Sequence, residues 1–205
     1  MYDYVSGFIN GFAIFGRDLR FGFLNEKSEE ICPAIYDGVQ HFQYHVAIVE
    51  RNAKYGVINE RGKEIISAIC DYIYVLRFNF IQVSINGKVG IINNQGDYIC
   101  KPEYDAIFDF KNDYARALKD GKCGIIDSFG RVICSPKYDH IDNYESGLAK
   151  VYLNGKCGYI DTQGNEVCPV EYDQVWIHKD SIIAIRGYDV VRMDQKGQVK
   201  EETSK

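Results

Sequence analysis

The chain has 205 residues, of which 46% are hydrophobic and 26% are charged, and its formal net charge is -5. Such a composition supplies enough apolar surface for a globular core and excludes a chain that is disordered throughout. An acidic balance with both signs interspersed lacks the basic stripe that neutralises phosphates, and no apolar run approaches 18 residues. We therefore expect neither a nucleic-acid nor a membrane partner.

The first residues already belong to a repeated pattern and show no basic region followed by an apolar stretch. With Met1 as the native start, the missing signal sequence predicts a cytoplasmic protein. The pattern opens with a Tyr-Asp pair, which returns along the chain. The pairs are Tyr2-Asp3, Tyr36-Asp37, Tyr104-Asp105, Tyr138-Asp139 and Tyr172-Asp173, and Cys70-Asp71 fills the remaining place.

A second motif recurs at intervals of 34 residues. Residues 86–93, 120–127 and 154–161 share the form Asn/Asp-Gly-Lys-x-Gly-x-Ile-Asn/Asp, and Gly22 and Gly56 continue the same spacing upstream. A fixed period of this length is typical of a repeat architecture, in which each unit is stabilised by its neighbours.

Local chemistry indicates β-strands rather than helices. Each Asn-Gly or Asp-Gly pair suits a tight hairpin, and an Asn/Asp-x-x-Gly turn follows in most units, as at Asp161 to Gly164. Between the turns, apolar residues alternate, as at Ala149, Val151 and Leu153, which is the period of a half-buried strand. We predict four short antiparallel strands per unit.

These patterns predict an all-β fold of six β-repeats of about 34 residues, in a single domain over residues 1–200. Units start near residues 18, 52, 86, 120 and 154, a sixth unit is split between residues 2–17 and 188–200, and residues 201–205 are expected to form a disordered tail. Completion of the split unit by the two ends favours a propeller-like closed ring with few exposed edges. The alternative is an open superhelical or solenoid array of β-hairpins, because four strands in so few residues are short for a propeller blade.

The seven cysteines follow the repeat. Cys32, Cys100, Cys134 and Cys168 share one position with Ile66, and Cys123 and Cys157 share another with Phe21, Tyr55 and Val89. A position that accepts these residues requires a small or medium hydrophobe, so we predict packed thiols. The chain has no Cys-x-x-Cys motif, and its histidines (His41, His45, His140 and His178) lie at unrelated repeat positions. We expect no metal and no cofactor.

The combined pattern resembles the WG-repeat family of bacterial proteins. The best match is residues 156–164, Lys-Cys-Gly-Tyr-Ile-Asp-Thr-Gln-Gly, preceded by Tyr138-Asp139 and by residues 144–151. The family's tryptophan is replaced in every unit, by Phe21, Tyr55, Val89, Cys123 and Cys157. The resemblance implies a repeat module that serves as a binding or interaction element.

Catalytic signals are weak. The chain contains no nucleophile elbow, phosphate-binding loop or zinc-protease motif, and one Asp per unit gives no close carboxylate pair of the kind that glycoside hydrolysis needs. We predict no catalytic residue. Each recurring Asp is expected to cap its own turn or to bond a neighbouring backbone group.

The third residue after each recurring Asp varies, and it is Gln40, Tyr74, Phe108, Asp142 or Trp176. Large aromatic residues are enriched in binding hot spots, so Tyr74, Phe108 and Trp176 are our candidate partner-binding residues. The alternative interpretation is that they fill gaps between units. We predict a non-catalytic scaffold that binds a protein or peptide. The alternatives are a carbohydrate or cell-envelope binding module and, less favoured, a hydrolase on a β-propeller.

Overall fold

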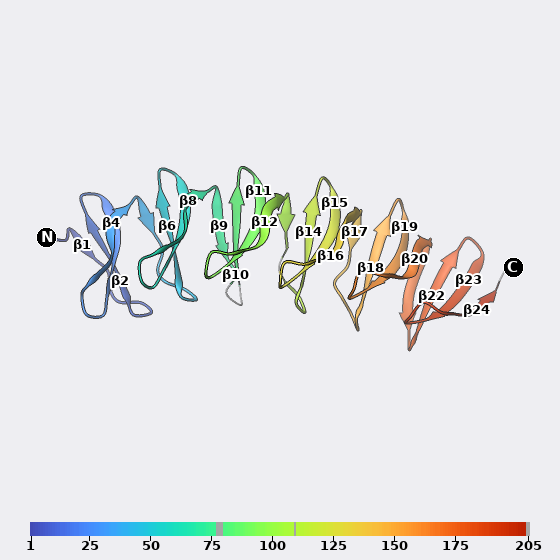
Figure 1. Ribbon diagram of the computed structural model, residues 1–205. Helices are drawn as coiled ribbons and strands as arrows, with labels where there is room; N and C mark the ends of the chain where they lie inside the picture. The colour runs from blue at the N-terminus through green and yellow to red at the C-terminus, as the bar shows by residue number, and fades with distance from the viewer. Residues whose placement is uncertain (77–79, 109, 204–205) are drawn as a thin grey trace. The chain divides into compact units, whose positions relative to one another are not determined.

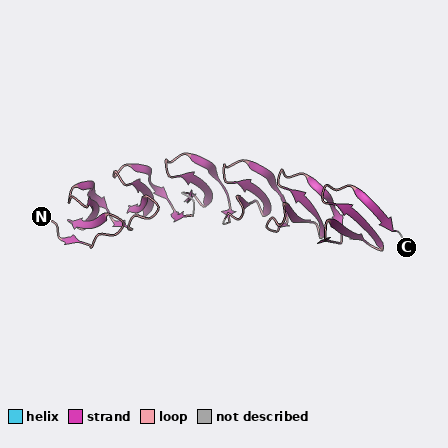
Figure 2. Cartoon of the chain, turned by 90° about the horizontal axis from the view of Figure 1, so that it is seen from below, coloured by secondary structure: helices cyan, strands magenta, loops and turns pink. Residues whose placement is uncertain are grey.

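The structure is a computed structural model that describes residues 1–76, 80–108 and 110–203. Every regular element in these ranges is a strand, and the strands form six four-stranded antiparallel sheets (Figures 1 and 2), which confirms the all-β class and the six repeats. Within each sheet the strands follow one another in chain order. The described ranges contain no helix long and apolar enough to cross a membrane.

The chain divides into two compact units, residues 1–103 and 104–205. The first unit holds three sheets, which we call A, B and C. Sheet A consists of β1 (Tyr4–Val5), β2 (Phe12–Arg17), β3 (Arg20–Asn25) and β4 (Glu30–Tyr36). Sheet B consists of β5 (Gly38–Val39), β6 (Val46–Arg51), β7 (Lys54–Asn59) and β8 (Glu64–Cys70). Sheet C consists of β9 (Tyr72–Val75), β10 (Phe80–Ile85), β11 (Lys88–Asn93) and β12 (Tyr98–Tyr104).

The second unit holds sheets D, E and F. Sheet D consists of β13 (Ala106–Ile107), β14 (Tyr114–Lys119), β15 (Lys122–Asp127) and β16 (Val132–Tyr138). Sheet E consists of β17 (His140–Ile141), β18 (Leu148–Leu153), β19 (Lys156–Asp161) and β20 (Glu166–Tyr172). Sheet F consists of β21 (Gln174–His178), β22 (Ser181–Arg186), β23 (Asp189–Asp194) and β24 (Val199–Thr203).

The predicted turns form as their chemistry requires. Asn154 and Gly155 adopt φ values of 52° and 76° between β18 and β19, which suits a two-residue hairpin turn of the primed type. Asp18 and Leu19 make the equivalent turn with φ values of 51° and 59°, although this pair has no glycine. In the next turn of sheet E, Asp161 Oδ1 accepts hydrogen bonds from the backbone N–H groups of Gln163 and Asn165.

Neighbouring sheets within a unit pack face to face. We call the face that packs on the following sheet the forward face, and the opposite one the rear face. Between sheets D and E, the core joins Ile125 and Tyr138 on the forward face of D to Val151 and Ile160 on the rear face of E. Equivalent cores join A to B, B to C, and E to F. Because each sheet contributes only a thin layer, its apolar residues are buried only through contact with a neighbour.

A glycine in the third strand allows two backbones to approach closely. A Cβ atom on Gly124 would lie 2.5 Å from the carbonyl oxygen of Cys134 and 2.7 Å from the nitrogen of Pro136. Opposite this glycine the register of β15 and β16 shifts, which marks a β-bulge. Sheet F has Val191 at the equivalent position, and there β23 and β24 pair without a shift. The glycine is therefore required by the bulged fourth strand.

Strand pairing corrects two of the expected boundaries. The segments 2–17 and 188–200 do not complete one split sheet, because β1 and β2 belong to sheet A, whereas β23 and β24 belong to sheet F. The reason is local: each hairpin joins strands that are neighbours in the chain, so every sheet starts directly after the recurring Asp. Residues 201–203 do not form a disordered tail, because they pair with residues 190–192 of β23. Residues 204 and 205 lie outside the described residues.

The bulge predicts a large effect for Gly124→Val. The added side chain would collide with the backbone of Cys134, so we expect the free energy of unfolding to fall by about 2 kcal/mol or more. Gly7→Val is the control, because a Cβ atom on Gly7 meets nothing within 4 Å. Urea unfolding of the two variants measures the difference, and a Gly124→Val protein as stable as the control would contradict the assignment.

The closed ring stays a prediction, and solution scattering tests it. A compact 205-residue domain has a radius of gyration of about 17 Å. We expect a value close to this for a closed ring, whereas an open superhelical array gives a clearly larger radius and an elongated pair-distance distribution.

Candidate binding site

The recurring Asp of each Tyr-Asp pair is bound to a hairpin of its own sheet. Asp139 Oδ2 accepts a hydrogen bond of 2.7 Å from the backbone N–H of Asn154, at the tip of the β18–β19 hairpin. The same bond, with lengths of 2.7 to 3.0 Å, joins Asp3 to Asp18, Asp37 to Asn52, Asp71 to Gly87, Asp105 to Asp120 and Asp173 to Gly187. The prediction that these carboxylates bond a neighbouring backbone group is confirmed.

The other oxygen of this carboxylate reaches the preceding sheet. Lys122 Nζ of sheet D lies 2.5 Å from Asp139 Oδ1 of sheet E, and Lys156 Nζ of sheet E lies 2.5 Å from Asp173 Oδ1 of sheet F. In the first unit, Arg20 binds Asp37, and Lys54 binds Asp71 at 2.6 Å. The Asp of one recurring motif and the cation near the hairpin of the other thus form an ion pair between adjacent sheets. A carboxylate with both oxygens engaged is a structural link rather than a candidate catalytic base.

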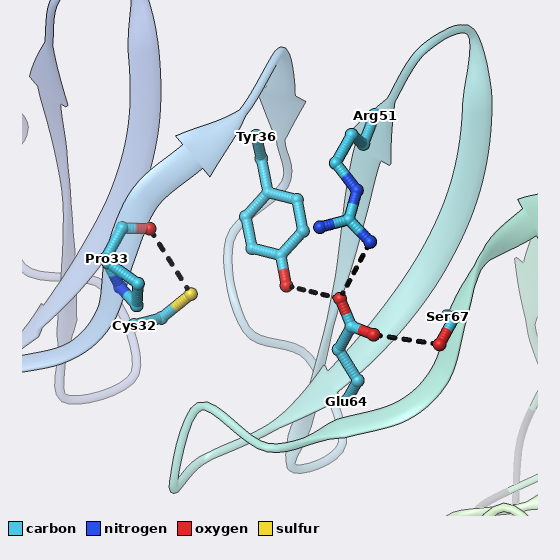
Figure 3. A network of polar contacts seen from close by, with 6 residues as sticks. All are labelled: Cys32, Pro33, Tyr36, Arg51, Glu64 and Ser67. Atoms are coloured by element: carbon cyan, nitrogen blue, oxygen red, sulfur yellow. Dashed lines mark hydrogen bonds and ion pairs between the residues drawn. The ribbon is translucent and has the colours of Figure 1, made fainter.

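A second link between sheets is a buried tyrosine (Figure 3). The Tyr36 hydroxyl of sheet A donates to Glu64 Oε1 of sheet B at 3.1 Å, and Ser67 Oγ donates to Glu64 Oε2 at 2.9 Å. Arg51 adds a bond of 3.5 Å to the same carboxylate. Burial raises the pKa of the Tyr36 hydroxyl, so the group stays protonated and acts as a donor. Tyr138 and Glu166 repeat this bond at 2.8 Å in the second unit.

All seven cysteines are free and buried, which confirms the prediction that they pack as hydrophobes. Cys32 donates a weak hydrogen bond to the carbonyl of Pro33 (Figure 3). Burial raises the pKa of the Cys32 thiol to about 11 and that of the Cys168 thiol to about 12. Neutral, enclosed thiols of this kind are poor nucleophiles.

The three predicted aromatic residues are all exposed, with 61% of Tyr74, 43% of Phe108 and 41% of Trp176 accessible. Tyr74 lies in β9 of the first unit. Phe108 and Trp176 share the second unit but belong to sheets D and F, and Asp142 takes the same position in the intervening sheet E. Phe108 and Trp176 are therefore not neighbours in the repeat order, and each must be judged with its own surroundings.

The surroundings of Phe108 and Asp142 serve packing between sheets. Arg116 places its guanidinium 4.9 Å from the centre of the Phe108 ring and donates to the carbonyl of Ile141 in the first strand of sheet E, at 3.1 Å. Lys150, beside Asp142, donates to the carbonyl of Val175 in the first strand of sheet F at 3.0 Å. Each cation thus caps a carbonyl on an edge strand of the following sheet, a role that sequence reasoning missed.

Trp176 has different neighbours. Ladder pairing places Trp176, Ile183, Arg192 and Glu201 in one row across the forward face of sheet F, with Val190 in the adjoining row. Trp176, Arg192 and Val190 are exposed, and Ile183 is half-buried. We call Trp176, Ile183, Val190 and Arg192 the Trp176 patch.

One position of this row is buried elsewhere in the second unit. Ile125 of sheet D and Tyr159 of sheet E occupy the position of Arg192, and only 2% and 8% of their surfaces are accessible. In the sequence, this difference is marked by a charged residue, Arg192, at a repeat position that is apolar in sheets D and E. Arg192 is held in place by a hydrogen bond of 3.1 Å from its Nε to Ser181 Oγ.

A cavity of about 10 Å³ lies between sheets D and E, lined in part by Tyr114, Arg116, Asp142 and Tyr144. This volume accommodates about one water molecule. Sites for small organic substrates are typically about 300 Å³ or more. The cavity is therefore too small for a substrate, and the exposed Trp176 patch is the better candidate for a binding site.

Comparison with known proteins establishes the family. The model of the WG containing repeat matches residues 21–55, 55–88, 90–123, 124–157 and 158–186, so the chain belongs to the WG-repeat family. No curated protein matches the chain.

Similar solved structures share little sequence with this chain. Apo AztD from Citrobacter koseri is 15% identical, with 99% of this chain and 72% of that chain covered and a TM-score of 0.38. Hsv2 from Kluyveromyces lactis is 10% identical over 90% of this chain and 70% of that chain, with a TM-score of 0.35. A eukaryotic initiation factor is 12% identical over 98% and 65%, with a TM-score of 0.37. At these scores the likenesses carry no argument about arrangement or function.

The carboxylate links predict acid sensitivity. The Lys122 ammonium and the backbone N–H of Asn154 hold the pKa of Asp139 below its ordinary value, and the N–H of Gly187 and the Lys156 ammonium do the same for Asp173. A carboxyl group whose pKa is lowered by folding contributes stability above its unfolded pKa, about 3.9, and loses it as the pH falls through the folded value. We expect the melting temperature to decrease when the pH falls below about 4.

The double variant Asp139→Asn, Asp173→Asn tests this assignment. We expect its melting temperature to depend less steeply on pH between 5 and 2 than that of the wild type. Asp180→Asn serves as the control, because Asp180 lies in the β21–β22 hairpin and its side chain makes none of these links. An unchanged slope in the double variant would show that the links do not carry the acid sensitivity.

Proposed function

We propose that this protein is a non-catalytic β-repeat scaffold that binds a protein or peptide partner in the cytoplasm. The observation that supports it is the Trp176 patch, where an exposed tryptophan, an exposed arginine and half-exposed aliphatic residues lie on one sheet face. Trp and Arg are the residue types most enriched among binding hot spots. Tyr74 and Phe108 offer further exposed aromatic contacts.

The patch suits a protein or peptide better than a small substrate. A flat sheet face has no enclosing walls, so affinity must come from contact area and from a few anchors. Trp176 provides a large apolar surface at low conformational-entropy cost, and the Arg192 guanidinium can pair with a carboxylate or a backbone carbonyl. The Arg192–Ser181 hydrogen bond reduces the side-chain freedom that binding would otherwise remove.

A carbohydrate ligand is the second candidate, because an exposed indole beside polar residues also offers a stacking surface for a sugar ring. Peptide and glycan arrays probed with the labelled protein separate the two. Protein binding predicts retention on peptides, and cell-envelope binding predicts retention on glycans. Turnover of a glycoside that persists in a Trp176→Ala variant would instead support a hydrolase.

Trp176→Ala is the decisive variant. Loss of a hot-spot anchor costs about 2 kcal/mol or more, so we expect binding to a peptide selected on the array to weaken by about 30-fold. Trp176 is the only tryptophan of the chain, so its fluorescence in the wild type reports contact with the peptide directly.

Tyr188→Ala is the matched control. Tyr188 is an aromatic residue of the same sheet that is 86% exposed, but it lies at the tip of the β22–β23 hairpin, outside the Trp176 patch. We expect its loss to change affinity by less than about threefold, in line with peripheral contacts that are energetically near neutral. Equal effects of the two substitutions would contradict a site centred on Trp176.

A further inference from the structure

The rear face of sheet A differs from the rear faces of the sheets that follow a neighbour within their unit. Its small core consists of Ala13, Phe15 and Leu24, with Ala34 beside them, and all four residues belong to sheet A. In the described part of the first unit, no core joins this face to another sheet. The face therefore shows what a repeat junction lacks when no preceding sheet fills it.

One element of the junction is supplied by the chain itself. The Tyr2 ring lies 4.7 Å from the centre of the Phe15 ring, and the Tyr2 hydroxyl donates to Glu30 Oε1 at 3.1 Å. This bond repeats the Tyr36–Glu64 link of the next junction (Figure 3). The tyrosine of the junction is therefore already in place.

The outer apolar residues of this face are not covered. Counted in 34-residue repeats, Val5 and Phe8 correspond to Ile141 and Tyr144 of sheet E. Val5 is 46% and Phe8 50% accessible, whereas Ile141 and Tyr144 are buried in the core between sheets D and E. Two apolar side chains that a preceding sheet covers elsewhere are thus exposed on sheet A.

Asp3 is a recurring Asp that makes only half of its usual contacts. Asp3 Oδ2 accepts the hydrogen bond of 2.9 Å from the backbone N–H of Asp18. At the next junction, Asp37 makes the same bond and also binds Arg20 of the preceding sheet. Among the residues that the structure describes, no lysine or arginine pairs with Asp3. An unpaired carboxylate therefore accompanies the exposed apolar residues.

The junction between sheets D and E shows which residues complement such a face. The hairpin of β14 and β15 begins its first strand with Tyr114, whose ring lies 4.7 Å from the Tyr144 ring. It begins its second strand with Lys122, which pairs with Asp139. Tyr144 and Asp139 are the equivalents of Phe8 and Asp3, so one hairpin covers the apolar position and neutralises the carboxylate.

The junction between sheets A and B uses the same pair of residue types. The hairpin of β2 and β3 begins its strands with Phe12 and Arg20. The Phe12 ring lies 4.2 Å from the Phe42 ring, and Arg20 pairs with Asp37. An aromatic residue and a cation at the starts of the two strands are thus the complement in both units.

A second copy of this chain does not offer that complement on sheet F. Ser181 and Asp189 begin β22 and β23, so a hydroxyl replaces the aromatic ring and a carboxylate replaces the cation. Asp189 would repel Asp3 where Lys122 attracts Asp139. Charge therefore points to a hairpin of a different protein.

We propose that the rear face of sheet A binds a β-hairpin of a partner protein that carries an aromatic residue at the start of its first strand and a lysine or arginine at the start of its second. The aromatic ring packs on Phe8, and the cation pairs with Asp3. This surface belongs to the first unit, so it is separate from the Trp176 patch and does not depend on it.

The test uses the whole chain, isotopically labelled, and a cyclised peptide with the sequence of residues 114–127 and the change Cys123→Val. We expect saturable shifts of the backbone amide signals of Asp3, Val5 and Phe8. Peptides with Lys122→Glu or Tyr114→Ala should each bind at least fivefold more weakly, because one places a carboxylate beside Asp3 and the other removes the ring. Failure of the first peptide to bind, or shifts confined to other residues, would overturn the proposal.

Phe8→Ala tests the apolar contact on the protein. We expect it to weaken binding of the first peptide at least fivefold. Tyr4→Ala is the matched control, because Tyr4 is also about half exposed but precedes Val5 in β1 and so lies on the opposite face. Its loss should change affinity less than twofold, and equal effects of the two substitutions would contradict the proposal.

Asp3→Asn tests the ion pair. The asparagine keeps an oxygen for the N–H of Asp18 but loses the charge, so the preference for the Lys122 peptide over its Lys122→Glu variant should fall from at least fivefold to less than twofold. Loss of preference identifies a direct interaction, because a general weakening of sheet A would affect both peptides alike. A preference that persists in Asp3→Asn would overturn the assignment of the cation to Asp3.

Two further measurements separate the remaining occupants and proposals. Sedimentation of the wild type should show no self-association, and a dimer that Asp3→Asn and Phe8→Ala dissociate would assign the face to a second copy and overturn the proposal. Trp176→Ala should leave binding of the hairpin peptide unchanged, although it weakens binding of the array peptide. The two surfaces can therefore fail independently of each other.

Discussion

The structure depends on a carboxylate with two different partners. One oxygen of each recurring Asp binds the tip of a hairpin in its own sheet, and at four junctions the other oxygen binds a lysine or arginine from the preceding sheet. The first bond sets the position of the first strand relative to the central hairpin. The second joins that hairpin to the sheet before it. Because one side chain makes both, the internal geometry of a sheet and its stacking on a neighbour are not independent.

This coupling explains why short sheets suffice. A four-stranded sheet of this size buries little apolar surface by itself, and its stability must come from its neighbours. The ion pairs are partly exposed and individually contribute little. Their value is orientation: they hold adjacent sheets in the register in which Ile125 and Tyr138 meet Val151 and Ile160. The Tyr36–Glu64 and Tyr138–Glu166 bonds add a second fixed point at the same junctions.

Much of the fold was predictable because its signals are local. Asn154-Gly155 and Asp161 to Gly164 specify their turns through φ preference and side-chain bonding, and these turns formed as expected. The residue at which each sheet begins was not predictable from the repeat period, because a repeat has no intrinsic start. A ladder of hydrogen bonds decides whether residues 2–17 pair with the strands that follow them, and the pattern of residues alone does not.

The candidate site was only partly predictable for a related reason. Phe108 and Trp176 occupy the same position of the repeat, and sequence comparison treats them alike. Their surroundings differ because Arg116 lies across from Phe108, whereas Ile183 lies across from Trp176. Exposure of a sheet face depends on what packs against it, which is a property of neighbouring sheets. The aligned repeats contain one indication that this face of sheet F differs, because Arg192 stands at the position of Ile125 and Tyr159.

Several residues of sheet F differ from their equivalents in the other sheets, and these differences have a common effect. Asp189 stands where Lys122 and Lys156 bind the next carboxylate, so this hairpin would repel the group that the others attract. Val191 replaces the glycine that the bulge requires, and opposite Val191 the strands β23 and β24 pair in register. Arg192 and Glu201 replace residues that elsewhere fill the core between sheets. Each change weakens the fit to another repeat and leaves a polar face with an exposed tryptophan. These differences support the proposal that the forward face of sheet F binds a partner.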